Sequence, residues 1–124
     1  MNFISHTFTN GVQIVNTTPH EITFQDGEQI VQVPNCGTII NAKVIETIIT
    51  PGIPTFVKTE FVGDISGESA ITEIKNHFPN CIIVGSIIAA QAYPGKVVAM
   101  TPMPGFERVA LAEKRMNPAK FTIF

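Results

Sequence analysis

The chain has no tryptophan and contains one tyrosine, one leucine and two cysteines among its 124 residues. Cys36 and Cys81 belong to no Cys-x-x-Cys pair, so we expect reduced thiols, with Cys81 buried and Cys36 half-exposed in a turn. No apolar run approaches the roughly 20 residues that cross a bilayer, and no secretory leader is visible. We therefore expect a cytoplasmic protein with no membrane partner.

Sequence signatures for metal and phosphate chemistry are also missing. The three histidines are scattered, without His-x-x-His or Glu-x-x-His spacing, and neither a P-loop nor a dinucleotide-type glycine pattern occurs. We expect no metal and no cofactor. The net charge of -2 and the pI of about 5.8 argue against generic nucleic-acid binding, because such affinity comes mainly from neutralised phosphates.

Charge is unevenly distributed along the chain. Residues 1–95 carry three lysines against eight acids, whereas residues 96–124 carry five bases against two acids. The five bases of the last stretch are Lys96, Arg108, Lys114, Arg115 and Lys120. This segment is either an anion-binding site, in which arginine offers a planar fork to phosphate, or a solvated loop whose bases pair with neighbouring glutamates.

Eighteen isoleucines against a single leucine favour β-strands, because β-branched side chains are stiff. The Asp26-Gly27 pair predicts a tight hairpin, and we expect the strands around it to form an N-terminal antiparallel meander. Strand patterns occupy residues 12–15, 21–24, 28–33, 38–50, 56–62, 81–84, 96–101 and 121–124.

Helical spacing occurs in two places. Ile71, Ile74 and Phe78 form an apolar stripe that Pro79 ends, and residues 87–93 predict a helical turn or two. The expected fold class is α+β, with a mostly antiparallel β-sheet or small barrel and one or two short helices. We expect a single domain, 1–124, with an extended C-terminal segment from about 102 to 124.

The segment Asn16-Thr17-Thr18-Pro19-His20 gathers an amide, two hydroxyls and an imidazole within five residues. It is either a hydrogen-bonded turn or a functional segment in which His20 transfers a proton or contacts a ligand. Further along, Val84-Gly85-Ser86 predicts a strand that turns into a helix. The second glycine of a nucleophile elbow is missing, so Ser86 is either a helix cap or a contact to an anion.

Residues 14–22 resemble the opening of a family of small phage and prophage proteins, whose first strand typically ends in Asn-Leu-Thr-Pro-His. Thr17 stands where leucine is usual. Residues 83–90 are similar to the family's apolar strand, which is followed by serine and an alanine-rich helix. The resemblance leaves residues 34–80 unmatched. It implies a phage-encoded protein in the host cytoplasm and carries no assigned function.

The first functional hypothesis is a phage counter-defence sponge, a non-enzymatic protein that binds and sequesters a small anionic nucleotide-derived signalling molecule. We expect it to be a homo-oligomer whose C-terminal segment crosses to a neighbouring subunit. Phosphate contacts would come from Arg108, Lys114 or Arg115, stacking from Phe106 or Tyr93, and further ligand contacts from Ser86, Asn16, Thr18 and His20.

Two other functions stay open. The chain is a small hydrolase or lyase for a nucleotide-like ligand if His20 works with a carboxylate such as Glu21, Asp64 or Glu107. Alternatively, it is a structural or protein-binding phage accessory protein that docks through its proline-rich C-terminal segment. Recovery of an intact ligand after denaturation separates the first hypothesis from the enzyme, and failure to retain any ligand leaves the accessory role.

Overall fold

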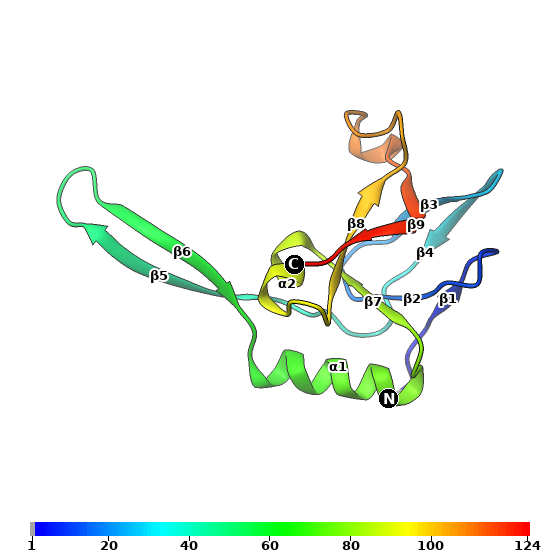
Figure 1. Cartoon of the computed structure of the whole chain (residues 1–124), viewed down its shortest axis with the longest axis horizontal. Helices are drawn as coiled ribbons and strands as arrows, with labels where there is room; N and C mark the ends of the chain where they lie inside the picture. Colours follow the sequence, from blue (N-terminus) through cyan, green and yellow to red (C-terminus); the bar gives the residue numbers. More distant parts are fainter. Residues whose placement is uncertain (1) are drawn as a thin grey trace.

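The computed structural model describes residues 2–124, in which strands outnumber helices (Figure 1). The elements in chain order are β1 (His6–Thr7), β2 (Gln13–Asn16), β3 (Ile22–Asp26), β4 (Gln29–Val33), β5 (Lys43–Thr50), β6 (Phe56–Val62), α1 (Ile65–His77), β7 (Ile82–Gly85), α2 (Ile87–Ala92), β8 (Val98–Pro102), the short 3-10 turn η1 (Leu111–Glu113) and β9 (Met116–Thr122). None of the helices in this described range has the length and apolar character that a membrane span requires.

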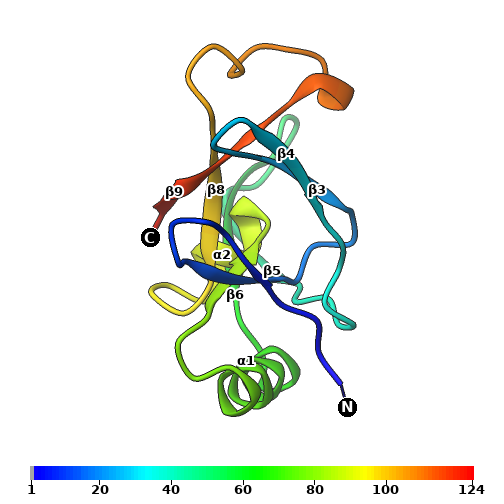
Figure 2. The same cartoon turned by 90° about the vertical axis from the view of Figure 1, so that its right-hand side faces the viewer.

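Seven strands form one mixed sheet in the order β1-β2-β7-β8-β9-β3-β4, and β5 and β6 form a separate hairpin. The pairs β2/β7, β7/β8 and β3/β9 are parallel, and the other pairs of the large sheet are antiparallel. Figure 2 shows β3, β4, β8 and β9 curving around the centre of the molecule, with α1 below them. The expected α+β fold with a small barrel is confirmed in this nearly closed sheet with two short helices.

The central strands are buried on both faces. Successive residues of β2, Ile14 and Val15, belong to two different core clusters, and Ile83 and Val84 of β7 alternate in the same way. One cluster lies on the helix side of the sheet and includes Ile71 and Ile74 of α1. Burial on both faces explains why these strands read as continuous apolar runs, as is typical of parallel strands.

The hairpin at Asp26-Gly27 is confirmed, because β3 and β4 pair antiparallel around it. The expected meander is wrong, since β2 pairs with β1 and β7 and makes no ladder with β3. The chain between β2 and β3 turns away at residues 17–21 instead of folding back in a tight hairpin. Cys36 is also fully buried rather than half-exposed, and both cysteines are free thiols.

The expected last strand, 121–124, is misplaced. The strand begins at Met116, ends at Thr122 and lies inside the sheet, between β8 and β3. Pro118 within it obscured the strand pattern, because proline cannot donate to a ladder. Residues 116–122 are thus part of the sheet of their own chain.

The side chain of Asn16, the last residue of β2, links the second strand in the order to β4, the edge strand at the far end. It is fully buried, and its amide nitrogen donates to the carbonyl of Val33, the last residue of β4, at 3.0 Å. The same nitrogen donates to the carbonyl of His20 at 2.8 Å, and its oxygen accepts from the N–H of Thr18 at 2.8 Å. The backbone carbonyl of Asn16 accepts from the N–H of Cys36 at 2.8 Å. These contacts hold β4 and the following loop against β2, so the sheet nearly closes.

Asp26 provides a second link across the structure. Its carboxylate accepts from the hydroxyl of Thr9 at 2.6 Å and from the N–H of Thr9 at 3.0 Å. Because both donors favour the charged form, the pKa of Asp26 lies below its ordinary value of 3.8. The pair fixes the β3–β4 hairpin to the turn between β1 and β2.

We predict that Asn16→Ala lowers the free energy of unfolding by about 2–4 kcal/mol, because buried carbonyl and N–H groups lose their partners. Asn76→Ala, an exposed position on α1, is the matched control and should change it by no more than about 0.5 kcal/mol. Urea denaturation followed by circular dichroism measures both. Equal stability of the two variants would contradict the role assigned to Asn16.

We also predict that acid destabilises the chain partly through Asp26. A carboxyl whose pKa is lowered by folding stabilises the folded state above its unfolded pKa, near 3.8, and this contribution is lost as the pH falls through the folded value. The urea midpoint of Asp26→Asn should therefore be lower than that of the unchanged chain at neutral pH. The difference between the two midpoints should become smaller below pH 3.8. Glu28→Gln, an exposed carboxylate in the adjoining turn, should show no such narrowing.

Candidate functional site

Four of the residues expected to contact a ligand line one depression, although they come from three separate parts of the chain. Thr18 and His20 follow β2, Ser86 precedes α2, and Lys114 follows η1. The depression has a volume of about 560 Å³. Its remaining lining residues are Pro19, Glu21, Ile22, Thr23, Met100, Leu111 and Met116. The walls are therefore mainly apolar, with a few polar groups at defined positions.

Two of these polar groups also have structural roles. The hydroxyl of Thr18 lies 2.7 Å from the side-chain oxygen of Asn16, and Ser86 accepts from the N–H of Ala89 at 3.1 Å, which makes it the N-cap of α2. The His20 carbonyl is fixed by the Asn16 amide, which sets the backbone that carries the imidazole. Within residues 2–124, the imidazole of His20 and the ammonium of Lys114 take part in no hydrogen bond or ion pair with the protein. They are the polar groups that a ligand would engage.

A second hollow, of about 430 Å³, adjoins the first through Thr23 and Lys114, which line both. It contains Phe106 and Arg115, and the guanidinium carbon of Arg115 lies 5.0 Å from the centroid of the Phe106 ring. Arg115 also donates to the side-chain oxygen of Gln25 at 2.8 Å. These contacts hold the arginine in a cation–π pair and fix its position beside β3. Arg108 is exposed on the preceding loop and lines neither hollow.

Tyr93 and Asn16, both expected at the site, lie in the interior instead. The Tyr93 ring is 1% exposed, and its hydroxyl oxygen accepts from the N–H of Asp64 at 2.9 Å. Gly63 and Gly67 lie against the ring, and a Cβ atom at either position would overlap the phenol. Burial is the main cause that raises the pKa of Tyr93 above its ordinary value. Tyr93 thus anchors the start of α1 to the end of α2 and presents no face to either hollow.

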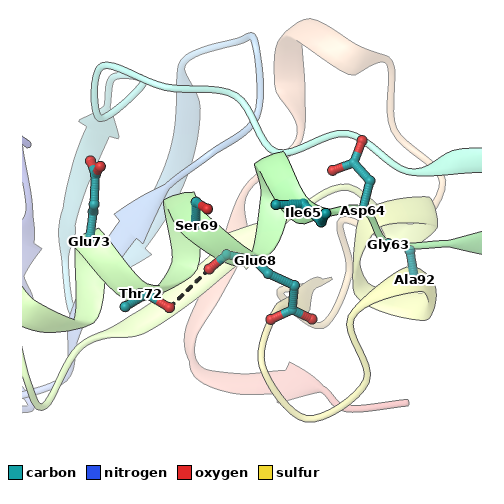
Figure 3. Close-up of a pocket in the computed structure, with 8 residues that line it drawn as sticks. All are labelled: Gly63, Asp64, Ile65, Glu68, Ser69, Thr72, Glu73 and Ala92. Carbon is teal, nitrogen blue, oxygen red and sulfur yellow. Dashed lines mark hydrogen bonds between the residues drawn. The ribbon is translucent and has the colours of Figure 1, made fainter.

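An open, acidic hollow runs along α1 and is distinct from the depression (Figure 3). Its lining includes Asp64, Glu68 and Glu73, whose carboxylates point in different directions in Figure 3. Asp64 is the N-cap of α1 and accepts from the N–H of Gly67, while Glu68 pairs with Lys96 at 2.9 Å. No group of three or more potential metal ligands occurs in the part of the chain that the structure describes. This hollow would also repel an anionic ligand, because its charges are negative.

The depression was only partly visible in the sequence. His20 and Ser86 were found because polar residues follow a strand and precede a helix, and Lys114 was found from the clustered C-terminal charge. The apolar wall of Met100, Leu111 and Met116 was missed, since nothing in the sequence places the C-terminal strand beside residues 18–23. No protein family model, curated protein or solved structure matches the chain.

We predict that Gly67→Ala destabilises the chain by about 1–3 kcal/mol, because the added methyl group overlaps Tyr93 in a packed interior. Ser69→Ala, at an exposed position two residues further along α1, serves as the control and should be nearly neutral. In a Tyr93→Ala background, the penalty of Gly67→Ala should largely disappear. Thermal and urea unfolding of the four variants measure this coupling, and an unchanged penalty without the tyrosine ring would refute the packing argument.

Proposed function

We propose that this chain is a non-enzymatic binding protein for a small anionic, nucleotide-like ligand. The observation that carries the proposal is the convergence of Thr18, His20, Ser86 and Lys114 in one depression. Ligand pockets are typically about 300–1,000 Å³, with apolar walls and a small number of placed polar groups, and the depression fits this description. Its apolar wall suits the flat face of a base.

Lys114 gives the proposal its anionic character. The residue belongs to both hollows, so a phosphate near its ammonium would lie between the apolar depression and the paired Phe106 and Arg115. A lysine ammonium binds phosphate as a point charge, and a nearby guanidinium adds a planar fork. A ligand with a base in the larger hollow and a phosphate towards the smaller one would use both.

The distribution of the acids favours binding over turnover. Of the carboxylates considered as partners for His20, Asp64 caps α1 and Glu107 accepts from the N–H of Gly105. Glu21 alone of the three lines the depression. In residues 2–124 no hydrogen bond joins its carboxylate to the imidazole. A hydrolase or lyase that relies on His20 and Glu21 remains the alternative, and it is distinguished by product formation.

The resemblance to small phage proteins extends the proposal to biology. In that setting the bound molecule would be a nucleotide-derived signal of the host, and the chain would act by sequestering it as a homo-oligomeric sponge. Tight retention without chemical change is the property that this role requires.

We predict that Lys114→Ala weakens the binding of the best ligand by roughly tenfold or more, since a charge-assisted contact is lost. The ligand is chosen from a panel of linear and cyclic mono-, di- and trinucleotides by thermal shift and measured by calorimetry. Lys120→Ala, an exposed position on β9, removes the same charge outside both hollows and should leave the affinity nearly unchanged.

Ligand recovered after heat denaturation and analysed by mass spectrometry tests the non-enzymatic part. Intact recovery supports binding, whereas an altered product supports the hydrolase or lyase. Equal affinity of the two lysine variants removes Lys114 from the site. No thermal shift with any member of the panel would contradict the proposed ligand class.

A further inference from the structure

The β5–β6 hairpin projects far from the rest of the molecule (Figure 1). We call residues 43–62 the arm. Its two strands pair only with each other, and all eight residues of β5 and the first five of β6 are exposed. The tip is equally open, with Ile53 fully exposed. The arm therefore contributes almost nothing to the core of its own chain.

The register of the arm sorts its side chains onto two faces. Residues directly opposite each other share a face, so Val44 with Phe61 and Ile48 with Val57 lie on the same side. We call these four residues the apolar face. The other side bears three of the four charges of the arm, on Lys43, Lys58 and Glu60, and it also carries the exposed Ile45 and Phe56. Glu46, the remaining charge, lies on the same side as the apolar face, between Val44 and Ile48, and is exposed in one chain.

An isolated two-stranded arm of this kind has little stability of its own in water. A two-stranded sheet is marginally stable without a further layer to cover its apolar face. Both outer strand edges are long and unpaired, and such edges are normally protected by charge, proline or a covering element. Ile48 is 62% exposed and Val44 is 55% exposed, so the apolar face is unprotected in one chain. Most of the arm projects away from its own body (Figure 1), and of the four residues only Phe61, near the base of the arm, is half-buried.

A second copy of the same chain fits this surface. Packing the apolar face of one arm against that of another makes a two-layer sandwich, the usual way for a sheet to bury one face. The contact is self-complementary under a two-fold axis, so the same residues are satisfied in both copies and the assembly closes. All eight residues of β5 and the first five of β6 are exposed, so the strands of the arm are accessible to such a contact.

We infer that the arm is a self-association element that joins two copies of this chain through Val44, Ile48, Val57 and Phe61. The inference is independent of the proposed ligand, because none of these residues lines the depression or the hollow that adjoins it. It also changes which segment reaches a neighbour, since the C-terminal strand lies inside the sheet of its own chain and the arm does not.

The test compares the same substitution on the two faces of β5. Ile48→Lys places a charge on the apolar face, whereas Ile45→Lys places it on the opposite face, across from Glu60. Sedimentation velocity of the full chain over a dilution series should show a species of twice the 13.5 kDa mass. Ile48→Lys should raise the dissociation constant of the dimer by roughly a hundredfold or more, because the two-fold contact repeats the change in both copies. Ile45→Lys should raise this constant far less.

Cross-linking tests which surfaces meet. Both native cysteines are buried, so Ile48→Cys gives one exposed thiol, and a short bis-maleimide should link two arms. Thr47→Cys, on the opposite face, should link poorly. A purely monomeric unchanged chain overturns the inference, as does self-association that Ile48→Lys leaves intact. Circular dichroism and the thermal midpoint of Ile48→Lys should match the unchanged chain at dilutions where both are monomeric.

Discussion

The buried carboxamide of Asn16 is the interaction on which the rest of the structure depends. A seven-stranded sheet can remain open, with two exposed edges, or curve until its ends meet. Asn16 belongs to β2, the second strand in the order, and bonds to the last residue of β4, the edge strand at the far end. Because both of its donors and its oxygen are used inside the protein, the group is satisfied only when these two strands are together.

That closure also places the candidate site. The amide that bonds to Val33 also bonds to the carbonyl of His20, so one side chain holds the sheet closed and fixes the backbone that carries the imidazole. Two other polar residues of the depression come from elsewhere: Ser86 precedes α2, and Lys114 lies between η1 and β9. Strand β9 lies between β8 and β3 in the sheet. The polar segment after β2, residues 17–21, thus helps to hold the sheet closed, and it also lines the depression.

Local sequence patterns predicted most helices and strands, but they could not predict which distant strands pair. The Asp26-Gly27 hairpin, the stripe of Ile71 and Ile74, and the Ser86 cap were all readable, because each depends on neighbours within a few residues. The parallel pairing of β2 with β7 joins residues almost seventy positions apart, and no local signal specifies it. Of the expected ligand residues, Tyr93 and Asn16 lie in the core, because aromatic and amide side chains suit buried sites as well as binding surfaces.

Tyr93 and Ser86 cap the two ends of α2, a helix of six residues. Ser86 lines the depression, and the ring of Tyr93 packs against Gly63, the residue that follows the arm. A helix of this length spans about 9 Å, and its capped ends leave it little freedom to stretch or slide. It therefore connects the base of the arm to the depression. In a pair of chains held by their arms, the separation of the two depressions would be fixed by the geometry of each protomer.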